Sequence, residues 1–291
     1  MPAACCGIVG MRPSRGRWPG GGCVPLDSTK DTPGPMGATV ADVAILDAIV
    51  CGDDQPAAPA SLEGIKVLVA EDWMEKLVDL TSDKAREAVS VARAALEAAG
   101  ATVISDAGFR QVVDLEPTMI RSPDSDRLAA LQAYLDRHQD RPEGMQTAEH
   151  VVKQMADMLP KAVWPTHLDG GYTEDRKKAF AEYYTAAKDA TEEAYRRFFA
   201  DKGIQAVMVP TIPDEPHSVA DWTSEAEPSP MGAFKLASYT ISFNSCSVPS
   251  LSVPTPIIST DSAIPMSVLL WGVDDRELLS VGMALEKAMK S

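Results

Sequence analysis

The sequence predicts an α/β protein, in which short apolar strands form a sheet and amphipathic helices cover it. Residues 65–70 form a β-branched run, a helical pattern follows from Ser82 to Ala99, and residues 102–104 form a second β-branched run. Such a unit implies two parallel strands joined by a right-handed crossover. Further strand-like runs near the C-terminus and a closing amphipathic helix complete the α/β pattern.

The first fifty residues predict closely packed backbone, then a turn and a helix. Residues 2–17 run from small and apolar side chains into glycines, which is typical of backbone packed against backbone. Residues 31–36 form a proline-stiffened turn. A helix then begins at Thr39, which can cap it together with Asp42, and runs to about Val50. The apolar stripe expected at helical spacing comprises Val40, Val43, Ala44, Leu46 and Ile49.

The middle of the chain predicts a surface connection at 53–60 and helices at about 124–137, 146–158 and 174–202. The broad apolar face of the last helix is interpreted as core, with a role in lining a substrate site as the alternative. That face comprises Phe180, Tyr183, Tyr184, Ala187, Ala190, Ala194, Phe198 and Phe199. Trp164 and Tyr172, in loops between helices, are the other candidates for such lining, and packing is the alternative for each.

The C-terminal third predicts three strands and two helices. A buried strand at 205–213 leads into an acidic, proline-rich loop at 214–230, and a short helix covers about 234–244. Strands at 248–254 and 264–271 follow, and an amphipathic helix at 274–289 ends the chain.

Charge and cysteine usage limit the class of protein. The formal net charge of −15 argues against nucleic acid or an anionic membrane surface as partner. No apolar run is long enough to span a bilayer, and the N-terminus shows no secretory signal pattern. Five cysteines, an odd number, favour reduced thiols over a disulfide framework. We therefore expect a cytoplasmic protein.

No cluster predicts a metal or cofactor. Adjacent Cys5 and Cys6 have poor spacing for zinc. Cys6 could serve as a replacement nucleophile, but a small buried hydrophobe is the favoured interpretation because no His or Lys accompanies it. The pairs 53–54 and 274–275 are interpreted as solvated turn or helix-entry aspartates. The histidines show no triad spacing, and His138 and His150 are expected to be solvated.

Many residues of the first stretch fall at the positions of one signature. It reads Gly-Gly-Ser-(Ile/Val)-Arg-x-Pro-Ala, then Cys-Gly, Gly, Lys/Arg-Pro-Ser/Thr and Gly-Arg, and continues through Asp-Thr, Gly-Pro and a Thr-Val-x-Asp helix. The matching residues are Pro2, Ala3, Cys6, Gly7, Gly10, Pro13, Gly16, Arg17, Asp31, Thr32, Gly34, Pro35, Thr39, Val40 and Asp42. Through them the chain resembles the amidase signature family, with 17–19 and 31–36 most similar to its indoleacetamide and mandelamide hydrolase branch.

The resemblance implies a mixed, twisted central sheet flanked by helices, and hydrolysis of a small amide to acid and ammonia by a serine, a cis-serine and a lysine. In the family the nucleophilic serine belongs to the Gly-Gly-Ser-x-Arg segment. Met1 corresponds to the position directly after that arginine, so the serine position lies before Met1. The resemblance therefore implies that no catalytic residue lies in this chain. It implies a C-terminal portion of one amidase domain over 1–291, with a variable helical region at about 106–203 and the N-terminal part missing. In this interpretation the chain alone is inactive.

The resemblance also assigns roles to particular residues. Thr240 and Asn244 are expected to contact substrate, and the residues expected to be structural parts of the signature are Pro2, Cys6, Gly7, Gly10, Arg17, Asp31, Gly34 and Pro35. Ala237 stands where transamidase relatives carry an aspartate, which disfavours a glutaminyl-tRNA amidotransferase subunit. Residues 247–248 and 254–256 depart from the family pattern and are expected to stiffen turns beside the sheet.

Three interpretations remain open. They are a shortened gene product, one half that pairs with a complementary N-terminal half, and a non-catalytic binding or scaffold protein. The partners expected are a small amide substrate and either that complementary half or a homo-oligomer. Loss of the front of a sheet predicts exposed strand edges and exposed apolar surface.

Overall fold

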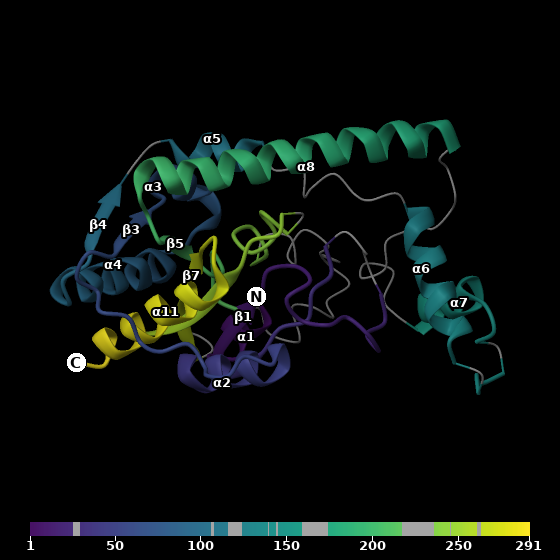
Figure 1. Ribbon diagram of the computed structural model, residues 1–291, viewed down its shortest axis with the longest axis horizontal. Coiled ribbons are helices and arrows are strands. Elements are labelled where there is room, and N and C mark those ends of the chain that lie inside the picture. The colour runs from purple at the N-terminus through teal and green to yellow at the C-terminus, as the bar shows by residue number, and fades with distance from the viewer. Residues whose placement is uncertain are drawn as a thin grey trace.

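A mixed seven-stranded sheet forms the centre of the molecule (Figure 1). The computed structural model describes residues 1–25, 30–105, 108–115, 124–138, 140–143, 145–158, 174–216, 236–244, 246–260 and 263–291. The strands are β1 (Val9–Arg12), β2 (Met36–Gly37), β3 (Lys66–Val69), β4 (Thr102–Ser105), β5 (Ala206–Pro210), β6 (Ser250–Ile258) and β7 (Pro265–Trp271). Their order in the sheet is β2-β1-β6-β7-β5-β3-β4.

The strand directions explain why the sheet is mixed. β3 pairs in parallel with β4 and with β5, which confirms the predicted strand–helix–strand unit. All other neighbours pair antiparallel. β1 lies inside the sheet between β2 and β6, so the glycine-rich first stretch is part of the sheet.

All but one of the predicted helices are present, with small changes in bounds. Those that match a prediction are α2 (Val40–Cys51), α4 (Asp83–Ala98), α6 (Asp124–Asp136), α7 (Ala148–Met158), α8 (Glu174–Lys202) and α11 (Asp275–Met289). The short helices α1 (Pro2–Cys5), α3 (Glu71–Lys76) and α5 (Phe109–Asp114) were not predicted. Ser82 caps α4 by accepting from the Ala85 N–H. None of the described helices combines the length and the apolar character that crossing a membrane requires.

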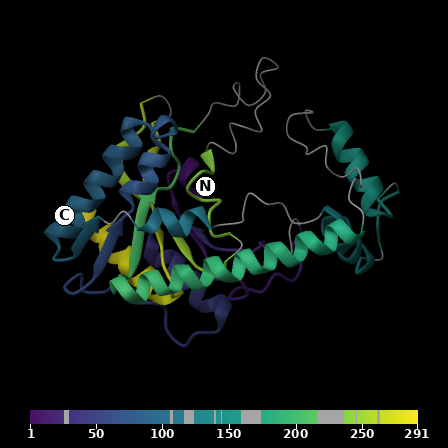
Figure 2. The same cartoon turned by 90° about the horizontal axis from the view of Figure 1, so that it is seen from above.

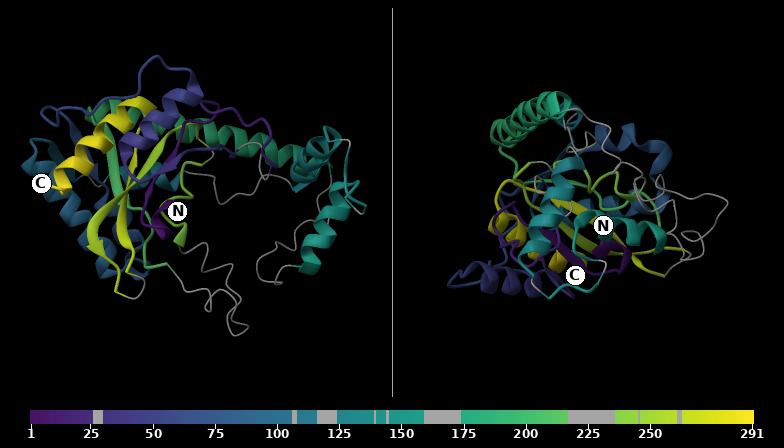
Figure 3. Two further views of the ribbon diagram at one scale, coloured as in Figure 1. Left: turned by 90° about the horizontal axis from the view of Figure 1, so that it is seen from below. Right: turned by 90° about the vertical axis from the view of Figure 1, so that its right-hand side faces the viewer.

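Two helix layers cover the sheet. α2, α4 and α11 lie on one face, where their apolar residues join those of β1, β3, β6 and β7 in one core (Figure 3). α3, α5, α8 and the chain before β6 pack on the other face. The side chains of β3, β5 and β7 alternate between these two cores.

The second core is aromatic. Phe243 lies at its centre, with ring centroids 4.9 Å from Tyr195, 5.4 Å from Trp271, 5.8 Å from Phe109 and 6.1 Å from Trp73. Most of these pairs are edge-to-face or tilted, the arrangements that aromatic quadrupoles favour.

α8 runs past the sheet and leads toward α6 and α7 (Figure 2). Tyr184 and Phe199 are buried as predicted, but Tyr183 and Ala190 are exposed. Thr191 and Tyr195 are buried as well, and Tyr195 and Phe199 belong to the core against which the C-terminal half of this helix packs. The Phe180 side chain, Trp164 and Tyr172 lie outside the described residues.

The predicted stripe of α2 is wrong at its C-terminal half. Val40, Val43 and Ala44 are buried, whereas Leu46 is exposed and Ile49 is 71% exposed. Asp47 takes the inward position on this turn and is only 1% exposed.

Two C-terminal expectations also need correction. Only Leu236 is helical in the described stretch 236–244, which otherwise consists of successive turns. Residues 254–256 form no turn but belong to β6, where the pairing with β7 shifts register between Pro254 and Ile258. Most of the predicted loop at 214–230 lies outside the described residues.

Candidate functional site

The first helix and first strand pack with almost no space between their backbones. A Cβ on Gly10 would lie 2.5 Å from the Ala3 Cβ, and one on Gly34 would overlap the Met11 carbonyl oxygen. Only glycine allows these approaches. The Met11 N–H also donates to Pro35 O (3.0 Å), which holds the 30–35 loop on β1.

Residues 236–244, the candidate segment, lie beside α1. Ala4 packs with Ile212 and Leu236 in a small apolar cluster, and Cys5 borders it. Cys6, expected to be buried, is exposed, because α1 ends at Cys5 and the chain turns at Gly7 toward β1. The candidate segment therefore borders the part of the chain that carries the signature.

Arg12 holds the end of the candidate segment. Its Nη2 donates to Asn244 O (2.9 Å) and to Lys30 O (3.0 Å), and its Nη1 donates to Val248 O (3.2 Å). One guanidinium thus joins β1 both to the loop at Lys30 and to the chain at Asn244 and Val248. A planar guanidinium with fixed donors suits such a role better than a lysine would.

α8 holds the adjacent main chain. Glu192 accepts from the Ser247 N–H (3.1 Å), and Arg196 donates to Ser247 O (3.1 Å). The Ser247 hydroxyl donates to Arg15 O (3.2 Å). The chain after Asn244 is therefore tied both to the signature and to α8.

Two buried aromatic residues anchor the candidate segment. Phe243 has φ of 61° with a fully buried ring, a backbone conformation that costs on the order of 1–3 kcal/mol in a residue with a side chain. Tyr239 shares a hydrogen bond with Thr81 (2.8 Å), and burial raises the pKa of Tyr239 to about 12. Strain of this kind gathers at functional sites and is maintained here by the aromatic core.

Of the predicted substrate residues, Thr240 lies between these anchors and Asn244 directly follows the second. Both Thr240 and Asn244 are half-buried, and the Thr240 hydroxyl donates to Ala237 O (3.2 Å). Asn244 Oδ1 is buried without a hydrogen-bond partner in the described part of the chain, as is Thr32 Oγ1. Each such atom costs about 1–3 kcal/mol relative to a satisfied one.

A buried hydroxyl pair lies on the same side of the sheet. Thr211 and Ser252 side chains are 3.0 Å apart, and the Thr211 N–H donates to Ser267 O. Ser252 stands opposite Gly10 in the ladder. Sequence patterns indicated these residues only as parts of C-terminal motifs, since nothing in their spacing reveals a contact between the ends of two strands.

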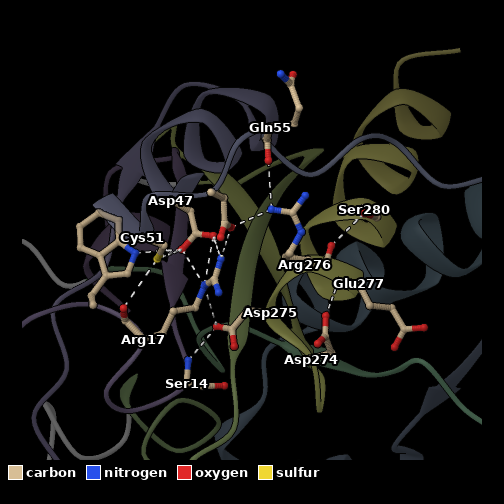
Figure 4. A network of polar contacts seen from close by, with 12 residues as sticks. Ser14, Arg17, Asp47, Cys51, Gln55, Asp274, Asp275, Arg276, Glu277 and Ser280 are labelled. Atoms are coloured by element: carbon tan, nitrogen blue, oxygen red, sulfur yellow. Dashed lines mark hydrogen bonds and ion pairs between the residues drawn. The ribbon is translucent and has the colours of Figure 1, made fainter. Parts of the chain in front are cut away.

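A second polar cluster, here called the ion network, lies at α2 and α11 (Figure 4). Arg17 donates to both carboxylate oxygens of Asp47, with Nη2 to Oδ2 at 2.6 Å, and its Nη2 also donates to Asp53 (2.9 Å). Arg276 donates to the same Asp53 oxygen (2.7 Å). Trp18 Nε1 (2.9 Å) and the Cys51 thiol (3.7 Å) also donate to Asp47, a buried carboxylate.

The ion network corrects the interpretation of two aspartates as solvated charges. Asp53 is paired with two arginines. Asp275 is buried and accepts from the Ser14 N–H (2.8 Å). Asp274 does mark the helix entry, since it caps α11 by accepting from the Glu277 N–H. The network therefore joins the signature to α2 and α11.

The network shifts the pKa of several groups. Hydrogen bonds from Arg276 and Arg17 lower the pKa of Asp53, whereas burial raises the pKa of Asp275. The hydrogen bond to Asp47 raises the pKa of Arg17. Burial, followed by the nearby Asp47 charge, raises the pKa of Cys51, which disfavours a reactive thiolate there.

The remaining sequence candidates are placed elsewhere. Pro2 begins α1, Gly7 follows it against Pro265, and Asp31 is exposed. His138 and His150 are exposed as predicted, and the other two histidines lie outside the described residues. Among described side chains, no three His, Cys, Asp or Glu residues gather to hold a metal ion.

Comparison with known proteins matches this arrangement to one family. The family model described as Amidase matches residues 1–279. Indoleacetamide hydrolase of Rhizobium radiobacter is 26% identical over 308 residues, which cover 99% of this chain and 60% of that protein. Mandelamide hydrolase of Pseudomonas putida is 25% identical over 99% of this chain and 56% of its own length.

Solved structures agree on the fold. An amidase family protein from Bacillus anthracis superposes with a TM-score of 0.68 and 19% identity, over 99% of this chain and 54% of that one. The chain thus spans about three fifths of the length of the curated relatives it matches.

Proposed function

The chain belongs to the amidase signature family, and from this premise we propose that it forms the scaffold and the acyl-side wall of an enzyme that hydrolyses a small carboxylic amide to the acid and ammonia. The family match over residues 1–279 carries the proposal. The names of the similar proteins, indoleacetamide hydrolase and mandelamide hydrolase, support an aryl-acetamide as substrate.

The proposed reaction is acyl transfer through a serine. A serine oxygen attacks the amide carbon, ammonia leaves, and water hydrolyses the acyl-enzyme. Backbone N–H groups stabilise the oxyanion. By the resemblance, none of these 291 residues corresponds to the serine, the cis-serine or the lysine. The proposed role of this chain is therefore to bind the substrate and to support the catalytic residues.

Thr240 and Asn244 are the proposed contacts to the acyl part of the substrate. Their position beside α1 supports this role. So do the hydrogen bond from Arg12 to Asn244 O and the buried ring of Phe243, which both fix the candidate segment. Contacts made by rigidly held residues are the ones that orient a substrate for reaction. We expect the signature residues, Arg17 above all, to maintain this arrangement.

The proposal is tested with the purified 291-residue chain and two amides, indole-3-acetamide and mandelamide. We expect calorimetry to detect binding of at least one amide, and an ammonia assay to detect no release. Release of ammonia would show that catalysis needs no residue outside this chain. Binding of neither amide would contradict the proposed substrate role.

A second candidate is a chain that works only within an assembly with a further copy or a complementary polypeptide. The exposed apolar residues Ile45, Leu46, Ile49 and Val50 on α2 favour it, because such contiguous exposure is uncommon on monomers. Light scattering would give a mass above 31.1 kDa for a self-associating chain. A cooperatively melting monomer without amide binding would instead favour a non-catalytic binding protein.

A further inference from the structure

Ser247, three residues after Asn244, is held through its N–H, its carbonyl oxygen and its hydroxyl. The N–H donates to Glu192 Oε2 (3.1 Å), the carbonyl accepts from Arg196 Nη2 (3.1 Å), and the hydroxyl donates to Arg15 O (3.2 Å). Glu192 and Arg196 belong to α8, whereas Arg15 belongs to the signature stretch. The main chain just beyond the candidate segment is therefore fixed by two parts of the molecule.

The α8 side chains that hold Ser247 are themselves paired. Glu192 Oε1 accepts from Arg196 Nε (3.2 Å) and Nη2 (3.1 Å), and Lys188 Nζ lies 3.9 Å from Glu192 Oε2. The Lys188 and Glu192 side chains are only 18% and 21% exposed. A hydrogen bond that a carboxylate accepts is stronger than one between neutral groups. The two cations keep this carboxylate in the orientation that receives the Ser247 N–H.

Helix α8 also contacts the other loop that Arg12 holds. Arg12 donates to Lys30 O as well as to the candidate segment. Lys30 Nζ lies 5.4 Å from the centre of the Tyr184 ring on α8, a distance at which a cation is attracted to a ring face. Both segments are thus tied to β1 through Arg12 and to α8 through side chains of that helix.

We propose that Glu192 and Arg196 are positioning residues, which hold Ser247 and thereby keep Asn244 where it contacts the acyl part of the amide substrate. This inference rests on the proposed function, which makes Asn244 a contact to the substrate. A contact residue that shifts by about 1 Å loses much of its effect on binding and orientation. Helix α8 therefore acts on the substrate through the main chain that it holds.

The helix supplies a matched control one residue further on. Glu193 forms the same i,i+4 ion pair with Arg197, but these two side chains are 70% and 65% exposed. Glu192→Ala removes the acceptor of the Ser247 N–H. Glu193→Ala removes an equivalent carboxylate whose ion pair faces the solvent.

Two measurements on the full chain test the proposal. Hydrogen exchange followed by NMR should be about tenfold faster at the Ser247 amide in Glu192→Ala, and unchanged in Glu193→Ala. Calorimetry with the tighter-binding of mandelamide and indole-3-acetamide should give about tenfold weaker binding to Glu192→Ala and unchanged binding to Glu193→Ala. Arg196→Ala, at a position that is 45% exposed, should weaken binding by about threefold, because the Glu192 hydrogen bond remains.

The possible failures are distinguishable. Unchanged exchange at Ser247 in Glu192→Ala would overturn the inference. Faster exchange with unchanged amide binding would also overturn it and would leave the proposed function standing. Binding of neither amide by the unmodified chain would overturn both. Melting temperatures more than about 5 °C below that of Glu193→Ala, in Glu192→Ala and in Arg196→Ala, would show a general loss of stability and would overturn the positioning role.

Discussion

Helices α2 and α11 lie on the same face of the sheet and both begin with a side-chain cap, yet they face the core differently. α11 buries a continuous apolar side that includes Leu278, Leu279 and Leu285. α2 buries Asp47 and leaves Ile49 exposed. Apolar residues are thus not the only ones that decide which side of a helix turns inward.

The sequences of the two helices explain the difference. α11 carries its charged residues in its first and last turns and on its outer side, so its pattern has one clear direction. α2 reads VADVAILDAIVC and is apolar nearly all round, so periodicity alone gives it no preferred side. The ion network supplies the preference, because Asp47 must face Arg17 and Trp18.

The largest effect should come from truncating the buried side of α11. Leu279→Ala should lower the free energy of unfolding by about 3 kcal/mol, since it leaves a cavity in a fully buried position. Ile49→Ala on α2 is the control and should change it by less than about 0.5 kcal/mol. Urea denaturation measures both. A large loss for Ile49→Ala would mean that α2 is covered in solution.

Asp47→Ala should come next, with a loss of about 2–3 kcal/mol, because it leaves Arg17 without its main partner in a partly buried place. The value lies at or below the usual range for a broken buried pair since Arg17 is 20% exposed and keeps Asp53. Urea denaturation again measures the loss. Unchanged stability would mean that the ion network does not decide which side of α2 faces the core.

Removal of the helix caps should have a smaller and nearly equal effect on both helices. Thr39→Ala and Asp274→Ala each remove a side chain that accepts from the helix N-terminus, and each should cost about 1 kcal/mol. Thermal unfolding measures both, and Asp54→Ala, in the exposed connection after α2, serves as control. A much larger loss of stability for Thr39→Ala would indicate that the capping box with Asp42 also helps to decide which side of α2 faces the core.

The smallest effect should appear as pH dependence. Asp53, which joins the end of α2 to Arg276 of α11, has a lowered pKa. It therefore stabilises the fold above the ordinary carboxyl value of about 4, and this contribution is lost as pH falls through that value toward its folded-state pKa. Asp275 acts in the opposite direction, because burial raises its pKa and protonation then favours the folded state.

Melting temperatures measured from pH 7 down to pH 3 test this linkage. Asp53→Asn should show a shallower fall than the unmodified chain, and the exposed neighbour Asp54 provides the control variant Asp54→Asn. Identical profiles for all three proteins would exclude Asp53 as a contributor.

Much of the fold could be predicted, because the pattern of neighbouring residues was sufficient to identify many of its strands and helices. The runs at 65–70 and 102–104 are short and β-branched, and the helix between them is capped by Ser82 and ends before Gly100. The candidate site was predictable only in part. Resemblance indicated Thr240 and Asn244, but the contacts of Arg12 with three distant carbonyls have no signal in spacing.

The sequence by itself determined the α/β class, the parallel strand–helix–strand unit, the helix caps and the family, because each depends on neighbouring residues or on a motif of fixed spacing. Only the tertiary structure decided which side of α2 is buried, the burial of Asp275 and the meeting of the Lys30 and Asn244 carbonyls at Arg12. These features depend on partners that are distant in the chain, and the free energy of pairing buried charges and polar groups there outweighs local periodicity.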